Sequence, residues 1–384
     1  MSQPLTYLDN NATTRPDERV VAVMLPLFTE RYGNPSSGHR LGAQAAAEVE
    51  EARARVAALI GARDSEIVFT SGGTEADNAA LRGVLAASPG KRHLIVSAVE
   101  HHAILETGER LEEEGVHVSR IDVDDAGRLD LDGLAGAIRD DTALISVMLA
   151  NNETGVIFPL KEVCRIARER GVLVHTDAVN ALGKMPVDVE ELGVALLSLS
   201  GHKIYGPKGA GALYIRRGTA FRACQTGGSQ ERGRRGGTLN APGIVGLGMA
   251  CQVLRERGPE EVVRIRTLRD RLEVELQRRL PDVQIIGAAA ERLPNTALVC
   301  FPGIAAQALL ILLSEAGICV SGGAACASGS LEPSHVMKAM GVDPGVAQGE
   351  MRFSLGRFNT EADLDRLFEV LPAALKKVAA SGLC

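Results

Sequence analysis

The apolar positions of this chain follow two alternating patterns between about residues 45 and 260. Short runs of Val, Ile and Leu, such as residues 93–98 (HLIVSA) and 143–149 (ALISVML), are apolar on both faces. Between such runs lie longer stretches with apolar residues three or four positions apart, such as residues 103–115. The first pattern is typical of strands buried in a parallel sheet and the second of amphipathic helices. Their alternation predicts an α/β domain in which helices cover a mainly parallel sheet.

The predicted strands of this domain cover residues 66–70, 93–98, 116–122, 143–149, 172–177 and 194–200, and the predicted helices cover residues 45–61, 76–87, 103–115, 131–139 and 161–171. The pattern changes near residue 258, where a helix is expected to run to about residue 280. Shorter strands and helices follow, in the mixture typical of an α+β domain. We therefore predict a large domain of residues 15–258 and a smaller domain formed by residues 1–14 and 259–384.

Composition and charge narrow the class of protein. The 384 residues are 45% hydrophobic and carry a net charge of −6, which disfavours non-specific binding to nucleic acids or to anionic membranes. No apolar run reaches the roughly 18 residues of a membrane span. The N-terminus has neither the basic nor the apolar region of a secretory signal. We therefore expect a cytoplasmic protein with no nucleic-acid or membrane partner.

The seven cysteines are odd in number, widely scattered and without a CxxC motif. This pattern argues against a disulfide framework and against a four-cysteine metal site. Cysteines in strand-like or helical patterns are expected to be small buried hydrophobic residues. Cys326 differs, because it lies in residues 321–330 (SGGAACASGS), where almost no side chain can pack in a core. Its pattern alone leaves open a metal ligand, half of a disulfide, a buried residue or a nucleophile on a mobile loop.

Polar residues gather after the predicted strands, where ligands bind in sheets of this type. After residues 66–70, Gly73 and Thr74 open a helix whose backbone N–H groups could hold an anion, although a capped helix start explains the same residues. The spacing matches neither a P-loop nor a GxGxxG motif. His101 could be an aromatic platform, a core residue or a metal ligand, and Asn152 could be a hydrogen-bonding amide or part of a turn.

Two further strand ends carry charged residues. Asp177 ends a buried strand with no Lys or Arg beside it, so a protonated ligand nitrogen is a candidate partner. Lys203 follows Ser200 and His202; held against a sheet end, it would be desolvated and could act as a nucleophile or base, although most such lysines are surface residues. Pyridoxal phosphate would use all of these groups: an anion site for its phosphate, a buried acid, a lysine, a flat ring and amide donors.

The sequence resembles the cysteine desulfurases of the NifS/IscS type, a group within the class V aminotransferases, and the nitrogen-fixation (NifS) branch fits best. The resemblance covers essentially the whole chain. It rests on the motifs YLDNNATT, YGNPSSGH, FTSGGTEADN, ANNETG, HTDAV, SLSGHKIYGPKG, QERGRRGGT, GGAACASGSLEPSHV and RFSLGRF. It implies a fold-type I pyridoxal-phosphate transferase with a seven-stranded, mainly parallel sheet and a smaller α+β domain carrying the catalytic-cysteine loop, residues 321–334.

The resemblance also implies an activity. L-Cysteine would be converted to L-alanine, and its sulfur would pass to Cys326 as a persulfide for delivery to an iron–sulfur scaffold protein. Cys326 would also be a transient ligand of an iron–sulfur cluster during delivery. The small residues around Cys326 would let its loop move.

The family motifs assign roles to individual residues. Lys203 would bind the cofactor covalently and move the substrate Cα proton, with His101 stacking on the ring and Cys326 taking the sulfur. Thr238 would reach the cofactor phosphate of a second subunit, which implies a homodimer. The expected cofactor-binding residues are Gly73, Thr74, His101, Asn152, Asp177, Asn180, Ser200, His202, Lys203 and Thr238. The expected substrate-binding residues are Asn34, Asn152 and Arg352.

One departure and two rival interpretations remain. The family usually has Gln where this chain has Asn180, whose side chain is shorter by about 1.5 Å. Another fold-type I enzyme, such as an aminotransferase or a selenocysteine lyase, would have a similar cofactor site but no use for Cys326. A non-enzymatic metal or iron–sulfur scaffold is a second rival, which the cysteine spacing disfavours.

Overall fold

The computed structural model describes residues 5–322 and 333–380, so Cys326 and most of its loop lie outside the described residues. The helices are α1 (Glu18–Met24), α2 (Pro26–Thr29), α3 (Arg40–Leu59), α4 (Gly73–Ala87), α5 (His102–Glu113), α6 (Leu131–Ala137), α7 (Leu160–Glu169), α8 (Val189–Leu192), α9 (Ala241–Arg279), α10 (Ala306–Glu315), α11 (His335–Ala339), α12 (Pro344–Ala347) and α13 (Glu361–Ala380). The strands are β1 (Thr6–Tyr7), β2 (Ile67–Thr70), β3 (His93–Ser97), β4 (His117–Ile121), β5 (Thr142–Ser146), β6 (Leu173–Asp177), β7 (Leu196–Ser200), β8 (Gly211–Ile215), β9 (Gln284–Ile286), β10 (Thr296–Cys300), β11 (Ile318–Cys319) and β12 (Glu350–Ser354).

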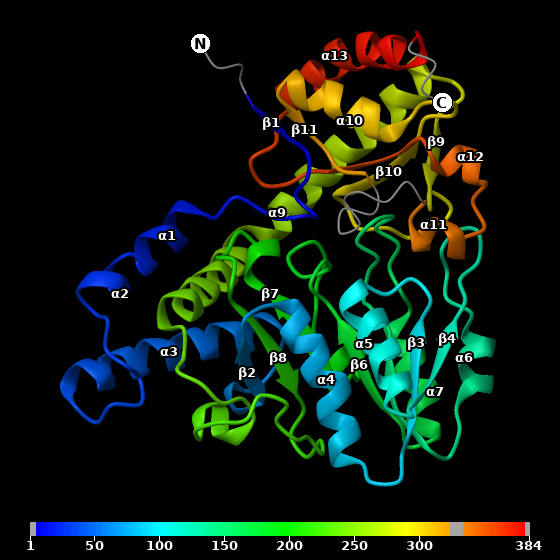
Figure 1. Cartoon of the computed structure of the whole chain (residues 1–384). Helices are drawn as coiled ribbons and strands as arrows, with labels where there is room; N and C mark the ends of the chain where they lie inside the picture. The colour runs from blue at the N-terminus through cyan, green and yellow to red at the C-terminus, as the bar shows by residue number, and fades with distance from the viewer. Residues whose placement is uncertain (1–4, 323–332, 381–384) are drawn as a thin grey trace.

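The main sheet has seven strands in the order β2-β8-β7-β6-β5-β3-β4 (Figure 1). Strands β7, β6, β5, β3 and β4 run parallel to one another, and β8 pairs antiparallel with both β2 and β7. Every residue of β8, β7, β6, β5 and β3 is buried or nearly so, which explains their mostly apolar sequences, whereas the edge strand β4 exposes His117 and Arg120. The predicted α/β fold with a mainly parallel seven-stranded sheet is confirmed.

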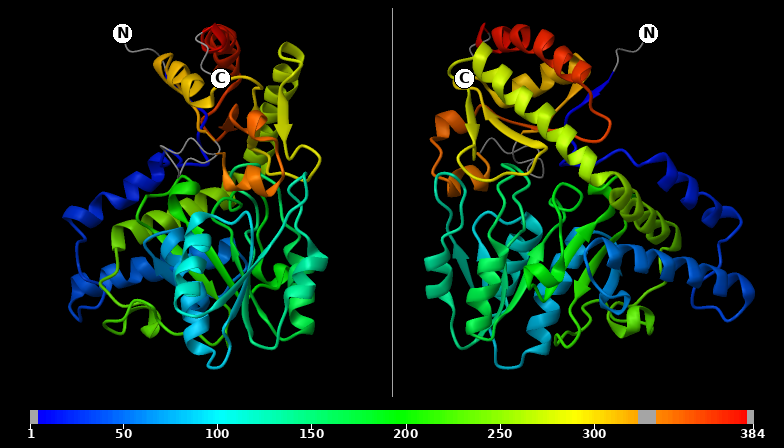
Figure 2. Two further views of the ribbon diagram at one scale, coloured as in Figure 1. Left: turned by 45° about the vertical axis from the view of Figure 1, so that its right-hand side comes forward. Right: turned by 180° about the vertical axis from the view of Figure 1, so that it is seen from behind.

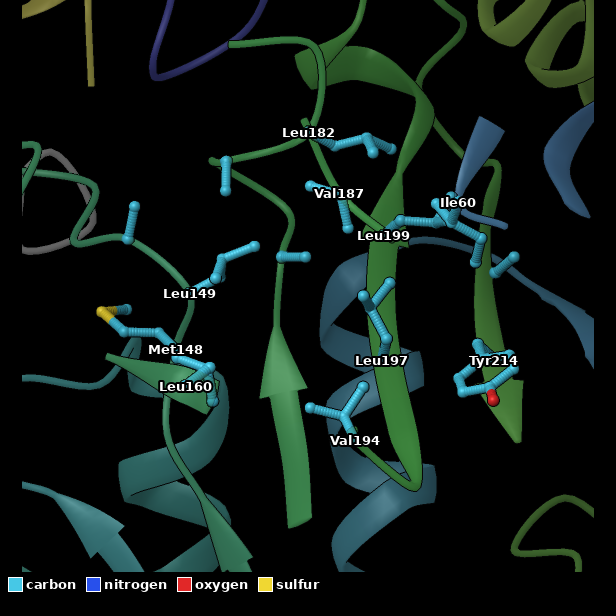
Figure 3. Packing of buried hydrophobic residues seen from close by; sticks show 14 of the residues in the cluster. Ile60, Met148, Leu149, Leu160, Leu182, Val187, Val194, Leu197, Leu199 and Tyr214 are labelled. Carbon is cyan, nitrogen blue, oxygen red and sulfur yellow. The ribbon is translucent and has the colours of Figure 1, made fainter. Parts of the chain in front are cut away.

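Helices cover both faces of this sheet. On one face α4 and α5 pack Ala80, Leu81 and Ile104 against strand residues such as Leu94 and Leu213. On the other face a larger cluster joins the sheet to α3, α7 and the first half of α9. Figure 3 shows part of that cluster, in which side chains from β7, including Leu197 and Leu199, meet Ile60 and Tyr214.

The second half of α9 and the chain that follows it form a second layer. This layer lies above the carboxyl ends of the main sheet's parallel strands (Figure 1). A three-stranded antiparallel sheet, β12-β10-β9, packs against the second half of α9, α10 and α13 around its own apolar cluster. β1 pairs in parallel with β11, which places residues 6–7 beside this layer. The exact domain limits at residues 14–15 and 258–259 stay a prediction.

Helix α9 differs from the expected helix of residues 258–280. It begins at Ala241 and runs for 39 residues through Gly258 and Pro259 (Figure 2, right). Its first half buries Leu247 and Leu254 in the cluster below, and its second half buries residues such as Leu272 in the cluster above. Burial on both sides holds the helix together across a proline that lacks an N–H donor.

A buried ion pair fixes the segment that leads from β8 to α9. Arg53 in α3 donates two hydrogen bonds to Glu231, at 2.8 and 2.7 Å, and Glu231 also accepts from the backbone N–H of Phe69 at 2.8 Å. Both charged side chains are almost fully buried, and Glu231 has a positive φ of 48°. The pair therefore ties an otherwise irregular loop to α3 and β2.

Replacing Glu231 by Ala is expected to lower the free energy of unfolding by about 3 kcal/mol, because it removes the buried carboxylate and leaves the Arg53 guanidinium paired, among the described residues, only with the exposed Glu50. Denaturant titration measures the change. Glu256→Ala is the matched control: its pair with Arg19 is exposed, so a loss of about 0–1 kcal/mol is expected. Equal losses in the two variants would contradict a special role for the buried pair.

Candidate active site

A cavity of about 400 Å³ lies where the parallel strands of the main sheet end. Loops after β2, β3, β5, β6 and β7 converge there, and Arg352 from β12 closes the cavity from the upper layer. Its lining residues are Asn11, Ala12, Gly73, Thr74, Asp77, His101, His102, Met148, Ala150, Asn152, Glu153, Asp177, Val179, Asn180, Ser200, His202, Lys203, His335 and Arg352.

Glycines allow close backbone packing at the start of α4. A Cβ added to Gly73 would lie 2.7 Å from Cγ2 of Val179, and one added to Gly211 would lie 2.7 Å from Cα of Gly72. Gly72 itself has a positive φ of 156°. Gly73 and Thr74 in the first turn of α4 line the cavity beside Ser200, and no described side chain caps the N-terminus of this helix. This arrangement suits an anion such as a phosphate.

Lys203 lies at the end of a short 3-10 turn after β7, over the cavity floor. Its Nζ donates to the backbone carbonyl oxygens of Asn11 and Ala12, the second at 3.0 Å. Both acceptors belong to the N-terminal segment that follows β1. The lysine that the sequence selected is therefore held in place by backbone contacts, with its amine in the cavity.

Two histidines flank Lys203. His101 caps α5 and accepts a hydrogen bond at Nδ1 from the backbone N–H of Ala103 at 3.1 Å, which leaves the ring proton on Nε2. Burial and the charge of Lys203 lower the pKa of His101 to about 4, and the same causes lower the pKa of His202 to about 4. Both rings are therefore neutral at pH 7.

Three carboxyl groups lie together under the cavity floor. Asp177 accepts a hydrogen bond from the backbone N–H of Val179 at 2.8 Å, and burial raises its pKa to about 6 even though Lys203 opposes the shift. Burial, with the negative charge of Asp177, raises the pKa of Asp77 well above its usual value. Burial likewise raises the pKa of Glu100 to about 8. These shifts favour the charged form for Asp177 at pH 7 and the neutral form for Asp77 and Glu100.

A neutral hydrogen-bonded chain supports these acids. His175 contacts Ser146 at 2.8 Å through Nδ1 and Ser198 at 3.0 Å through Nε2. Burial lowers the pKa of His175 to about 3, so its Nε2, 3.7 Å from Asp77, carries no positive charge. Asp77 therefore gains no cation from His175, which agrees with its holding a proton.

Arg352 is fully buried at the upper wall of the cavity. Its Nη1 donates to the backbone oxygen of Asn152 at 3.0 Å, and its Nη2 donates to Asp9 at 3.0 Å. Within the described part of the chain its Nε has no hydrogen-bond partner. The guanidinium is thus positioned firmly while one donor remains for another acceptor.

The described residues on both sides of the Cys326 segment lie at this cavity. Ser321 pairs with Arg352 through two backbone hydrogen bonds, at 3.3 and 2.7 Å. Ser334 donates to Glu153 at 2.5 Å, and His335 lines the cavity and contacts the backbone oxygen of Glu100 at 2.9 Å. The segment between them therefore begins and ends at the cavity wall.

Every expected cofactor-binding residue except Thr238 lines this cavity. Of the expected substrate-binding residues, Asn152 and Arg352 line it as well. Thr238 and Asn34 are exposed and line no part of the cavity in this chain.

Sequence reasoning missed Asp77, Glu100 and Lys184. An acid on the buried face of a predicted helix was a signal for Asp77, and an acid directly after a strand was one for Glu100.

These residues fit pyridoxal phosphate. The glycine-lined start of α4 can take the phosphate, Asp177 can face a protonated ring nitrogen, and Lys203 offers the amine for covalent attachment. Nδ2 of Asn180, which lines the cavity, is buried and has no hydrogen-bond partner among the described residues, as expected for a donor that faces a bound group. The fold and the site together define an enzyme of the pyridoxal-phosphate class.

Comparison with known proteins agrees with this class. Residues 6–367 match the family model "Aminotransferase class-V". The chain is 49% identical to a cysteine desulfurase of Trichormus azollae over 97% of this chain and 94% of that protein. It is 48% identical to the cysteine desulfurase NifS of Azotobacter vinelandii over 95% of this chain and 91% of that protein. A solved structure described as a NifS-like protein superposes with a TM-score of 0.89 at 41% identity, covering 98% of this chain and 99% of the other.

The chain belongs to the class-V aminotransferase family, and within it to the cysteine desulfurases, which are pyridoxal-phosphate enzymes. Across residues 5–322 and 333–380, no helix is both long and apolar enough to span a membrane. In the same residues no three His, Cys, Asp or Glu side chains are grouped to hold a metal ion. The expected transient cluster ligand, Cys326, lies outside this part of the chain.

Proposed function

We propose that this chain converts L-cysteine to L-alanine and takes the released sulfur onto Cys326 as a persulfide. The observation that carries the proposal is a single cavity that holds Lys203, Asp177 and the anion-binding start of α4. Both described ends of the Cys326 segment lie at its wall. Membership of the cysteine desulfurase family supports the same reaction.

When bound, pyridoxal phosphate supplies a protonated ring that can accept the electrons left at the substrate Cα. Lys203 would hold the cofactor and then carry the Cα proton at its Nζ. Asp177, charged at pH 7, would keep the ring nitrogen protonated. His101, neutral with its proton on Nε2, would cover the ring as a flat surface without adding charge.

The wall opposite the anion site would hold the substrate. Arg352 has one unused buried donor, and a guanidinium suits a carboxylate. Asn152 lies beside it, and its backbone oxygen already fixes the guanidinium. We assign these two residues to the substrate carboxylate. Asn34, outside the cavity of its own chain, would serve a substrate entrance only in an assembly.

The sulfur step balances without an external oxidant. The Cys326 thiolate attacks the substrate sulfur, the Cβ–Sγ bond breaks, and its electron pair stays on the carbon that becomes the alanine methyl group. The thiolate becomes a persulfide, and the protons gained by the carbon come from the site and from solvent. Cys326 follows Ser321 by five residues, and five residues can span at most about 17 Å from the cavity wall.

Mass spectrometry after addition of L-cysteine tests this proposal. The wild-type protein should gain about 32 Da on Cys326, the mass of one sulfur atom. Cys326→Ser should lose that gain and most alanine formation, yet keep the visible absorption of the bound cofactor. Cys224→Ser is the matched control, because Cys224 is a solvent-exposed cysteine that does not line the described cavity, and it should behave as wild type. Sulfur found on another cysteine would refute the role of Cys326.

The same variant separates the rival enzymes. An aminotransferase would convert an amino acid to an oxo acid and would not need Cys326. A selenocysteine lyase would release selenium from selenocysteine with or without Cys326. Loss of alanine formation from L-cysteine in Cys326→Ser, with intact cofactor absorption, favours the desulfurase.

The assembly and the place of action remain part of this proposal. We propose a homodimer in the cytoplasm in which Thr238 of one chain reaches the cofactor phosphate of the other. Large apolar side chains support a second copy: Leu25 between α1 and α2, Phe28 on α2 and Tyr32 in the loop that follows are 59%, 61% and 68% exposed. We further propose an iron–sulfur scaffold protein as sulfur acceptor, in keeping with the NifS relatives.

A further inference from the structure

Asn180 lines the cavity and presents one end of its amide to a lysine, while the other end has no partner among the described residues. Its side chain is buried and follows β6 by three residues. Oδ1 accepts a hydrogen bond from Nζ of Lys184 at 2.7 Å, whereas Nδ2 has no partner among the described residues. A buried N–H donor without a partner is costly, so its presence points to a bound acceptor.

Lys184 is placed to decide which end of the amide faces the cavity. Its Nζ lies 2.7 Å from Oδ1 and 2.7 Å from the backbone oxygen of the same asparagine. These two hydrogen bonds hold the Lys184 amine against Asn180. A lysine amine donates hydrogen bonds to these oxygens, which requires that Oδ1, and not Nδ2, point toward it.

This arrangement does not depend on the charge of Lys184. Burial, with the charges of Lys203 and Arg352, lowers the pKa of Lys184 well below its usual value. A neutral amine still has two N–H groups, one for each oxygen of Asn180, so both hydrogen bonds can persist when Lys184 loses its proton. The ammonium form, which only donates, fixes the direction of the amide more strictly than the neutral amine does.

We propose that Lys184 is a positioning residue that locks the Asn180 amide, so that its Nδ2–H donor is directed at an oxygen anion of the bound cofactor ring. Asn180 touches the cofactor, and Lys184 acts through Asn180. The inference rests on the proposed function, because it needs pyridoxal phosphate in this cavity. It also explains how a short Asn can hold a fixed direction: two hydrogen bonds from one lysine restrain the side chain and its backbone.

The proposal predicts a shift in the pH at which the visible absorption of the bound cofactor changes, and this pH can be measured without substrate. The negative charge of the ring oxygen stabilises the proton on the nitrogen that links Lys203 to the cofactor. A hydrogen-bond donor to that oxygen weakens this effect, so the nitrogen loses its proton at lower pH. Without the donor, that linkage keeps its proton to higher pH. The midpoint of the pH-dependent change in visible absorption should therefore rise when the donor is lost or turned away.

The experiment measures that midpoint for holoenzyme without substrate. Lys184→Met should raise it by about one pH unit, roughly the effect of one hydrogen bond to a charged group. Lys161→Met is the matched control, because Lys161 is an exposed surface lysine paired with Glu191, and it should not shift the midpoint. Lys184→Ala provides a second variant if the methionine prevents folding, with the same shift expected.

A double variant tests whether Lys184 acts through Asn180. Asn180→Ala should raise the midpoint, and adding Lys184→Met to it should cause no further rise, because the amide is already gone. An unchanged midpoint in both lysine variants, or a full additional shift in the double variant, overturns the proposal. A raised KM for L-cysteine with no change in midpoint also overturns it, since the donor would then face the substrate. A wild-type protein that shows no visible band would instead refute the proposed function.

Discussion

Lys203→Ala is expected to abolish the visible absorption of bound pyridoxal phosphate and to lower alanine formation by about 10³-fold or more. Nζ of Lys203 is the cavity amine that the backbone oxygens of Asn11 and Ala12 hold over the floor. Its removal takes away both the covalent attachment of the cofactor and the group that carries the Cα proton. Absorption spectra and an alanine assay measure the two losses separately.

Lys208→Ala is the matched control for this variant. Lys208 belongs to the same Gly/Pro-rich turn but is exposed and lines no part of the described cavity. It should keep the absorption band and most of the activity. A visible band in Lys203→Ala that sodium borohydride still removes would show that another amine binds the cofactor, and the assignment of Lys203 would fail.

Asp177→Asn should lower kcat/KM by roughly 10²- to 10⁴-fold, because it removes one partner of a buried ion pair with the ring nitrogen. Asp77→Asn is the contrasting variant and should change kcat/KM by less than about threefold. Burial and the charge of Asp177 raise the pKa of Asp77 well above its usual value and so favour its neutral form, for which an amide is a close substitute. Equal losses in the two variants would contradict this division of charge.

The pH dependence gives a second check on Asp177. Burial raises the pKa of Asp177 to about 6 in the protein without cofactor, so the carboxylate is present above that pH and lost below it. The difference in cofactor affinity between wild type and Asp177→Asn should therefore be large at pH 8 and shrink as pH falls through about 6. Equilibrium titration of cofactor-free protein with pyridoxal phosphate measures both affinities. A difference that grows at low pH would contradict the assignment.

The main sheet could be predicted because its central strands are buried on both faces. Continuous apolar runs such as residues 143–149 identified these strands without any knowledge of their neighbours. β8 was not among the predicted strands. It begins at Gly211, whose Cβ would lie 2.6 Å from the backbone oxygen of Leu199, so the close approach that requires glycine also made the segment read as a loop.

The residues of the site also differ in whether the sequence alone could reveal them. Asp177 and Lys203 could be selected because each follows a strand directly, and strand ends converge in a parallel sheet. Lys184 could not be selected, and Asp77 could be noticed only as an acid on the buried face of a predicted helix, because the importance of both residues comes from a neighbour in space. Asp77 matters through the charge of Asp177, from a different element, and Lys184 through a hydrogen bond to an amide whose orientation no sequence pattern specifies.

The continuity of α9 has a mechanical consequence. The two apolar clusters share one rigid rod of 39 residues, about 58 Å long, so the upper layer cannot tilt over the cavity unless this rod bends or slides. Bending costs least at Pro259, where a backbone hydrogen bond is already missing. The upper wall of the cavity, including Arg352, is therefore held at a fixed distance and angle from the main sheet by α9. Movement near the cavity is expected in the loops and not in the upper layer as a whole.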